Sequence, residues 1–264
     1  MQAPIGIFDS GVGGLSVLTE VQALLPNERL IYIADSHYLP YGDKPNALVI
    51  ERSVKLTEYL LAQQAKAVIV ACNTATAAAA GYLRECWPEL PIIGLEPAVK
   101  PAASYSKQGK IGVLATQGTL SSQRFASLLE RYAAALEVVS QPCIGLADQI
   151  ERGLLTTSET RALLERYLQP IQQAGCDALV LGCTHYPFIK PLLEELLDDS
   201  IKVFDTGPAI ARQLRTVLFQ RGLLADQSST HLPAFYTTGW PAQFEQVLHL
   251  LLNIRTAVQP LSLE

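Results

Sequence analysis

Two cysteines in the sequence each end an apolar run that has the character of a buried strand. Cys72 follows "AVIVA" and Cys183 follows "ALVLG", and a helix-forming segment comes after each. In open α/β sheets reactive groups lie at the carboxyl ends of strands, where a helix N-terminus favours the thiolate. Two such thiols facing one cavity could take a carbon-bound proton from one face of a substrate and return a proton to the other. The plain alternative is packing, because free cysteine behaves as a small hydrophobe.

Three further cysteines, Cys86, Cys143 and Cys176, lack this placement. Cys86 lies late in a helical stretch and Cys176 lies in a turn between a helix and a strand, so we assign all three to structural roles. No two of the cysteines form a CxxC pair, and their spacing is not that of a zinc site. Their odd number argues for reduced thiols rather than a disulfide framework.

Several titratable or polar residues lie near the expected strand ends. Asp9 ends the first expected strand and is followed by Ser10, and His185 lies two residues after Cys183. Glu151, in "IGLADQIERG", is an otherwise unexplained acidic residue. Such groups can hold or relay protons near a thiol. Each also has a plainer interpretation: Asp9 and Ser10 as a helix N-cap, His185 as a surface loop residue, and Glu151 as a solvated helix residue.

Short apolar runs alternate with longer amphipathic stretches along the chain. The stretches "LVIERSVKLTEYLLAQ" (48–63) and "TRALLERYLQPIQQ" (160–173) carry apolar residues at helical spacing. Apolar strands that alternate with helices predict a parallel sheet covered on both faces, so we predict an α/β protein of the doubly wound type. The expected strands are "IGIF" (5–8), "LIYIA" (30–34), "AVIVA" (67–71), "PIIGL" (91–95), "KIGVLA" (110–115), "ALVLG" (178–182) and "IKVFD" (201–205).

Three elements of the sequence recur in the same order, which favours an internal duplication. We therefore predict two similar α/β lobes, related by a pseudo-twofold axis, with the active site between them. Residues 1–96 and 208–264 form the first predicted lobe, and residues 97–207 form the second. The matching segments are "AVIVACNT" (67–74) with "ALVLGCTH" (178–185), "PAV" (97–99) with "PAI" (208–210), and "IGIFDSG" (5–11) with "IGVLATQG" (111–118).

The composition argues against several classes of function. The chain has 264 residues, of which 49% are hydrophobic, so it can bury a sizeable core. A formal net charge of -5, without a basic patch, argues against nucleic acid as a partner. No apolar run approaches the roughly 18 residues of a membrane span, and the N-terminal "MQAPIGIFDSG" lacks the regions of a signal peptide. We therefore expect a cytoplasmic protein without a membrane partner.

Four motifs together resemble those of the glutamate racemases, a family of cofactor-independent enzymes that act through a pair of cysteines. The motifs occur in the family's order over nearly the whole chain. In the related aspartate racemases the second cysteine motif usually continues with an acid rather than with "THYP", so this sequence falls on the glutamate side. The four motifs are "IFDSGVGGLSVL" (7–18), "PYG" (40–42), "ACNTAT" (71–76) and "GCTHYP" (182–187).

The resemblance implies roles for individual residues. Cys72 and Cys183 are the acid/base pair, of which Cys183 deprotonates L-glutamate and Cys72 deprotonates D-glutamate. Asp9 and His185 assist them, and Glu151 is a secondary aid. The enzyme is implied to use no cofactor or metal and to supply D-glutamate for peptidoglycan synthesis, and we also expect a homodimer. The implied substrate contacts are Asp9, Ser10, Tyr41, Gly42, Asn73, Thr74, Thr184 and His185.

Other functions stay open at this point. "GVGGLS" (11–16) follows an expected strand, and Asp35 lies about twenty residues further on, which nearly matches the fingerprint of a dinucleotide-dependent oxidoreductase. The match fails at Ser16, where the last glycine would stand, and Asp9 and Ser10 occupy the turn that pyrophosphate would approach. A pyridoxal enzyme, a racemase for aspartate or another amino acid, and a non-enzymatic two-lobe ligand-binding protein are the remaining alternatives.

Overall fold

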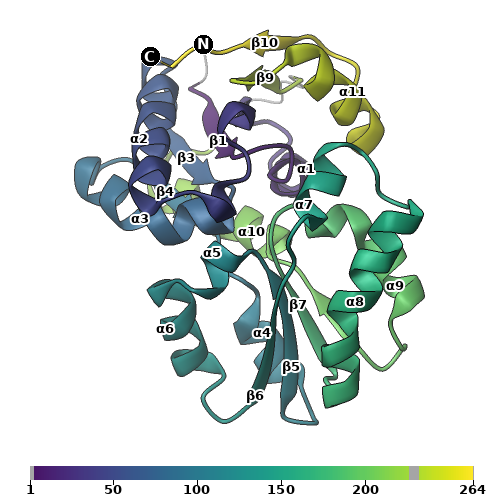
Figure 1. Ribbon diagram of the computed structural model, residues 1–264. Helices are drawn as coiled ribbons and strands as arrows, with labels where there is room; N and C mark the ends of the chain where they lie inside the picture. The colour runs from purple at the N-terminus through teal and green to yellow at the C-terminus, as the bar shows by residue number, and fades with distance from the viewer. Residues whose placement is uncertain (1–2, 226–231, 264) are drawn as a thin grey trace.

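Two lobes, each built on a parallel sheet, make up the computed structural model, which describes residues 3–225 and 232–263 (Figure 1). The strands are β1 (Ile5–Asp9), β2 (Leu30–Ala34), β3 (Ala67–Val70), β4 (Ile92–Gly94), β5 (Lys110–Ala115), β6 (Glu137–Pro142), β7 (Ala178–Gly182), β8 (Lys202–Phe204), β9 (Ala234–Thr237) and β10 (Val258–Pro260). The first sheet has the order β10-β9-β2-β1-β3-β4 and the second has the order β6-β5-β7-β8. Neighbouring strands pair in parallel throughout the described part of the chain, so the predicted α/β class is confirmed.

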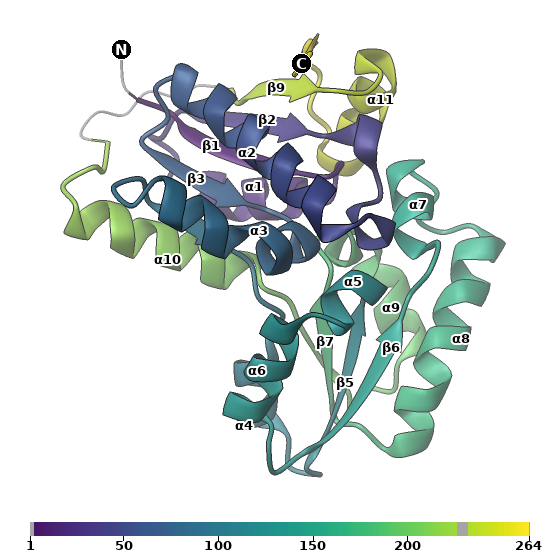
Figure 2. The same cartoon turned by 60° about the vertical axis from the view of Figure 1, so that its left-hand side comes forward.

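Helices cover both faces of each sheet, as Figure 2 shows from a second side. They are α1 (Leu15–Leu24), α2 (Asn46–Ala62), α3 (Asn73–Cys86), α4 (Val99–Tyr105), α5 (Gln117–Leu120), α6 (Gln123–Tyr132), α7 (Leu146–Glu151), α8 (Ser158–Ala174), α9 (Lys190–Leu196), α10 (Gly207–Gln220) and α11 (Pro241–Leu252), with 3-10 turns η1 (Ser36–Tyr38), η2 (Tyr41–Asp43) and η3 (Tyr186–Ile189). On the first sheet α1, α10 and α11 pack on one face, and α2 and α3 on the other. On the second sheet α7, α8 and α9 pack on one face, and α4 and α6 on the other. No helix within the described ranges is long and apolar enough to cross a membrane.

Each of the seven apolar runs contains a strand, but β6, β9 and β10 were not predicted. A continuous apolar run identifies a strand only where both of its faces are covered. β6 has no fully buried residue, and its sequence "EVVSQP" accordingly mixes polar and apolar side chains. β9 has four residues that alternate between buried and half-buried, and β10 has only three residues at the edge of the sheet.

The two sheets share a topology that matches the repeat in the sequence. In the first lobe β2-β1-β3-β4 are neighbours in that order, and in the second lobe β6-β5-β7-β8 are neighbours in that order. The second, first, third and fourth strands of each half therefore occupy equivalent places. β3 and β7, which carry the segments that align at an offset of 111, are the third strand in each half. This correspondence supports an internal duplication.

The chain crosses between the lobes twice, and its last segment returns to the first sheet. The crossings follow β4 and β8, and they are joined where the Thr206 hydroxyl donates a hydrogen bond of 2.9 Å to the Glu96 carbonyl. After the second crossing α10 packs on α1, β9 pairs with β2, and β10 pairs with β9. The helices of this last segment are α10 and α11.

Equivalent glycines in the two central strands let a helix approach the sheet closely. A Cβ atom on Gly6 of β1 would lie 2.6 Å from Leu60 of α2, and a Cβ atom on Gly112 of β5 would lie 2.6 Å from Ile171 of α8. Real carbon atoms do not approach so closely, so a larger residue at either position makes the facing side chain or its helix shift. The glycines therefore fix the distance between these helices and the strands whose ends form the site.

We expect Gly112→Ala to lower the free energy of unfolding by about 1–3 kcal/mol, because the added methyl group overpacks the contact with Ile171. Gly81→Ala is the matched control, since Gly81 lies inside α3 with no neighbour within 4 Å of an added Cβ. It should raise the free energy of unfolding by about 0.5–1 kcal/mol, because alanine loses less backbone entropy than glycine. Urea denaturation measures both, and a destabilised Gly81→Ala or an unaffected Gly112→Ala would contradict this packing.

Candidate active site

The carboxyl ends of the central strands in both sheets face one another across a cavity of about 20 Å³. Loops after β1, β2 and β3 supply one side, and loops after β5 and β7, together with α7, supply the other. Parallel sheets place functional groups at this edge. The lining residues are Ser10, Leu39, Pro40, Tyr41, Gly42, Cys72, Asn73, Thr74, Thr116, Thr119, Ala147, Gly182, Cys183, Thr184 and His185.

Most of the predicted site residues therefore meet in one place. Cys72 and Cys183 both line the cavity, one from each lobe, and the predicted substrate contacts line it with the exception of Asp9. Asp9 and Glu151 lie behind the lining, each hydrogen-bonded to a residue in it. The three cysteines assigned to structure are not in the lining; Cys143 and Cys176 are buried, and Cys86 is exposed.

Cys72 is the N-cap residue of α3. Its Sγ atom accepts a hydrogen bond from the Ala75 amide at 3.5 Å and lies 4.0 Å from the Ser10 hydroxyl. The expected lowering of the thiol pKa by this helix is nevertheless not found. Burial, together with the nearby negative charge of Asp9, raises the pKa of Cys72 well above its ordinary value despite the Ala75 amide.

Cys183 follows β7 and enters a different local structure from the one predicted. The segment after it is not an α-helix at once but the 3-10 turn η3, which contains Pro187, and α9 begins only afterwards. The charged partner of Cys183 is instead a side chain. His185 Nδ1 lies 3.5 Å from Cys183 Sγ, and both residues are buried.

His185 is held by a carboxylate that also reaches the opposite lobe. Its Nε2 atom lies 2.6 Å from Glu151 Oε1, and the same oxygen accepts a hydrogen bond of 2.7 Å from the Val12 amide. Burial by itself would lower the pKa of His185, but the neighbouring Cys183 and Glu151 raise it well above the ordinary value of 6.5. The arrangement thus favours an imidazolium beside the Cys183 thiol.

Asp9 connects the end of β1 to both lobes. Its carboxylate accepts hydrogen bonds from the Ser10 amide at 2.6 Å and from the Thr184 hydroxyl at 3.0 Å, as well as from the Gly14 amide. Gly14 is the N-cap residue of α1 and makes no side-chain cap. The Asp9 carboxylate therefore also binds the start of α1, as the plainer interpretation predicted. Complete burial raises the pKa of Asp9, which His185 opposes.

The glycine-rich turn after β1 is occupied by side chains from the second lobe. A Cβ atom on Gly11 would overlap the Glu151 carboxylate, and a Cβ atom on Gly13 would overlap the His185 ring. These glycines therefore admit Glu151 and His185, which occupy the space that a dinucleotide fingerprint keeps for pyrophosphate. The oxidoreductase alternative loses its main structural support.

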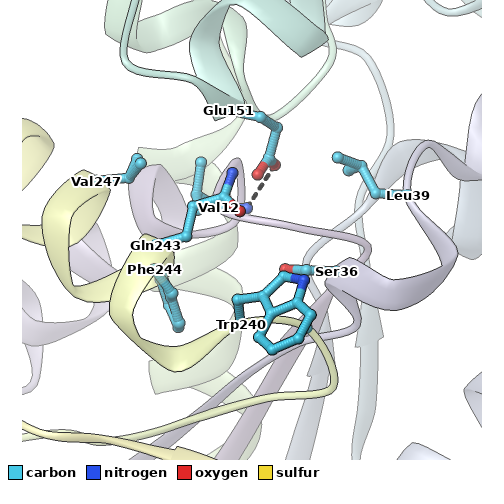
Figure 3. Close-up of a pocket in the computed structure, with 9 residues that line it drawn as sticks. Val12, Ser36, Leu39, Glu151, Trp240, Gln243, Phe244 and Val247 are labelled. Carbon is cyan, nitrogen blue, oxygen red and sulfur yellow. Dashed lines mark hydrogen bonds between the residues drawn. The ribbon is translucent and has the colours of Figure 1, made fainter.

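A second, larger cavity lies on the other side of Glu151 (Figure 3). Its volume is about 90 Å³. Figure 3 shows the Glu151 side chain directed at Val12 from α7, while the ring of Trp240 lies across the opposite side. Leu39 lines both cavities, whereas the two site cysteines line only the first. Among the described residues no group of three or more His, Cys, Asp or Glu side chains is arranged to hold a metal ion.

Comparison with known proteins connects this geometry to a family. The family model for Asp/Glu/Hydantoin racemase matches residues 15–214. The chain is 54% identical over 257 residues to the glutamate racemase of Ectopseudomonas mendocina, with 97% of this chain and 97% of that protein covered. The chain belongs to the Asp/Glu/hydantoin racemase family. It is an amino-acid racemase, an isomerase, so the resemblance drawn from the four motifs is confirmed.

Solved structures of family members share the whole fold. The glutamate racemase of Francisella tularensis in complex with D-glutamate superposes with a TM-score of 0.87 at 32% identity, covering 100% of this chain and 98% of that one. The Escherichia coli glutamate racemase in complex with L-glutamate and the activator UDP-MurNAc-ala superposes with a TM-score of 0.87 at 31% identity, covering 99% of both chains. The two-lobed fold is therefore that of the racemases.

Sequence reasoning missed Thr116, Thr119 and Ala147 in the lining of the racemase cavity. The hydroxyls of Thr116 and Thr119 lie 3.1 Å apart, and Thr116 is 3.0 Å from the Thr74 hydroxyl of the opposite lobe. The repeat contained a signal for one of them. Aligning "IGIFDSG" with "IGVLATQG" places Thr116 opposite Ser10, so a strand-end hydroxyl occurs in both halves.

We expect Glu151→Gln to lower the pKa of His185, because the amide oxygen can still accept the Val12 hydrogen bond while the negative charge is lost. An NMR titration of the imidazole measures this directly. A histidine with a raised folded-state pKa contributes stability that is fully present below about pH 6.5 and lost as the pH rises through the folded value. The variant should therefore be less stable than the parent protein at mildly acidic pH, with a difference that shrinks at alkaline pH.

Glu195→Gln is the control for this comparison, because Glu195 is exposed and pairs with Arg161 on the surface. It should leave the pKa of His185 unchanged. A stability difference between Glu151→Gln and the parent protein that grows as the pH rises would show that Glu151 does not hold the imidazolium.

Proposed function

We propose that this racemase interconverts L- and D-glutamate through Cys72 and Cys183 and without a cofactor. One observation carries the proposal: the two thiols line the same cavity but come from different lobes. Relatives with D-glutamate and with L-glutamate bound support glutamate as the substrate. From the family resemblance we further propose that the product D-glutamate serves peptidoglycan synthesis, and the homodimer stays a prediction.

The reaction requires the α-carbon of glutamate to lie between the two sulfur atoms. One cysteine, as a thiolate, removes the α-proton, and the electron pair of the broken C–H bond stays on a planar carbanion conjugated with the carboxylate. The opposite cysteine, as a thiol, donates its proton to the other face of the carbanion. The stereocentre is then inverted, and the two cysteines have exchanged protonation states.

The charges around the cavity support different means of forming the two thiolates. His185, with its raised pKa, supplies a positive charge 3.5 Å from Cys183 Sγ. The hydrogen-bond partners of Cys72 within the described residues are the uncharged Ser10 hydroxyl and Ala75 amide, and burial together with Asp9 raises its pKa. We infer that the ammonium group of the substrate lies beside Asp9 and supplies the missing positive charge, so that Cys72 ionises only when substrate is bound.

The size of the cavity requires the lobes to separate when substrate enters. A volume of about 20 Å³ is enough for about one water molecule and not for an amino acid. The hydrogen bonds from Thr184 to Asp9, from Val12 to Glu151 and between Thr74 and Thr116 join the lobes across the site. The crossings near residues 96 and 206 are the place about which the lobes would turn.

Cys72→Ser and Cys183→Ser should each lower racemisation in both directions by at least about a thousandfold, because every turnover needs one base and one acid and a hydroxyl ionises far less readily than a thiol. Cys176→Ser, a cysteine outside the cavity, should stay within about twofold of the parent protein. Polarimetry or circular dichroism of L- and D-glutamate measures the rates after exhaustive dialysis, with L-aspartate beside them. Activity that returns only with added metal or pyridoxal phosphate, or faster turnover of aspartate, would overturn the proposal.

In D₂O, deuterium should appear at the α-carbon of the product enantiomer.

The assignment of faces needs a substrate that reacts after a single deprotonation. In a glutamate analogue with a leaving group on nitrogen, loss of the α-proton expels that group and forms an imine, which hydrolyses to the 2-oxo acid and ammonia. We expect Cys72→Ser to retain more of this activity than Cys183→Ser on the L analogue, and the order to reverse on the D analogue. The same order for both enantiomers would leave one cysteine performing all proton transfer.

A further inference from the structure

A buried ion pair lies directly behind one wall of the cavity. The Arg52 guanidinium donates two hydrogen bonds to the Asp35 carboxylate, from Nε to Oδ2 at 3.0 Å and from Nη2 to Oδ1 at 2.9 Å. The exposed fractions of the two side chains are only 3% and 0%. A buried ion pair adds little stability over apolar side chains of the same size, because both charges lose their hydration. The other contacts of the pair indicate a different role.

The same two side chains hold three residues at the edge of the sheet where the site lies. The Tyr41 hydroxyl donates to Asp35 Oδ2 at 2.5 Å, and the Thr238 hydroxyl donates to Asp35 Oδ1 at 2.8 Å. The Arg52 guanidinium also lies over the ring of Tyr38, 4.1 Å from its centroid. Arg52 itself comes from the middle of α2, so a rigid helix anchors loops that follow β2 and β9.

One of these loops forms the wall of the cavity. Tyr41 and Gly42 line it, and a Cβ atom on Gly42 would lie 3.0 Å from Thr116 of the second lobe. Burial and the adjacent Asp35 raise the pKa of Tyr41, so its hydroxyl stays protonated and donates its hydrogen bond to Asp35. The position of the η2 turn against the opposite lobe therefore depends on a bond made outside the cavity.

We propose that Asp35 and Arg52 are positioning residues, which hold the turn Tyr41–Asp43 where it closes the substrate cavity. Neither residue lines the cavity, so neither takes part in proton transfer. Losing the pair should weaken the binding of both glutamate enantiomers and leave the rate of proton transfer between substrate and cysteines almost unchanged. The kinetic part of this inference rests on the proposed glutamate reaction.

Two variants separate positioning from stability. Arg52→Lys keeps a positive charge beside Asp35 but loses the paired hydrogen bonds to its carboxylate and the contact over the ring of Tyr38. The double variant Asp35→Asn/Arg52→Met removes both charges, so it avoids the unpaired buried carboxylate that makes Arg52→Met alone unstable. Ser53→Ala is the matched control, since Ser53 is a buried neighbour on α2 whose hydroxyl, among the described residues, bonds only to the Val49 carbonyl of its own helix.

For Arg52→Lys and the double variant we expect KM for L- and D-glutamate to rise about tenfold, with kcat within about twofold, because the loss is in substrate binding. The main-chain amides of residues 36–45 should exchange with deuterium at least about tenfold faster than in the parent protein. Ser53→Ala should change neither quantity. The double variant should unfold at a higher urea concentration than Arg52→Met while keeping the raised KM.

An Arg52→Lys or double variant with the KM and the exchange rates of the parent protein would overturn the proposal, since the pair would then serve stability alone. A loss confined to kcat would overturn it as well. If the double variant does not fold, Arg52→Lys decides. If the parent protein does not racemise glutamate, the proposed reaction fails, and the exchange of residues 36–45 still tests the positioning.

Discussion

Inverting a carbon centre by proton transfer requires two groups on opposite faces of one atom, and the edge of a single sheet presents its groups from one side only. For the proposed two-cysteine reaction, the fold would meet this constraint with two sheets whose carboxyl ends face each other. The third strand of each half ends at a cysteine, Cys72 after β3 and Cys183 after β7. Duplication of one α/β unit therefore gives two equivalent thiols, and packing the units face to face puts both on one cavity.

A few hydrogen bonds join the lobes across this cavity. Thr184 donates to Asp9, the Val12 amide donates to Glu151, and Thr74 meets Thr116. A hydrogen bond contributes roughly 0.5–1.5 kcal/mol net between neutral groups and roughly 1.5–3 kcal/mol when one partner is charged, so the proposed separation of the lobes would have to break only a few such bonds. The crossings near residues 96 and 206 are covalent and lie side by side, and they would keep the lobes aligned during that separation.

Although the lobes resemble each other, the electrostatics on the two sides of the cavity differ. On the side of Cys183, Glu151 and Cys183 stabilise a protonated His185 next to the sulfur. On the side of Cys72, burial and the carboxylate of Asp9 both raise the pKa of the thiol and so oppose its ionisation. The strands of the two lobes are arranged equivalently, but the loops around them carry different charged residues. The scaffold is therefore pseudosymmetric, whereas the site is asymmetric.

The amino-acid sequence by itself determined the features that depend on local pattern. Apolar runs covered on both faces identify seven strands, the repeat identifies two equivalent halves, and strand ends identify Cys72 and Cys183. The edge strand β6 was not found, because its sequence "EVVSQP" mixes polar and apolar side chains and has no continuous apolar run.

Only the tertiary structure decided which distant groups touch. Glu151 meets His185 from 34 residues away, and Thr116 meets Thr74 across the lobes. It also decided that Cys72 has a raised pKa, since a helix N-terminus is a local feature, whereas burial depends on tertiary packing and the approach of Asp9 depends on the pairing of β1 with β3. Charge and hydration depend on everything within a few ångströms of an atom, and the linear sequence does not specify that neighbourhood.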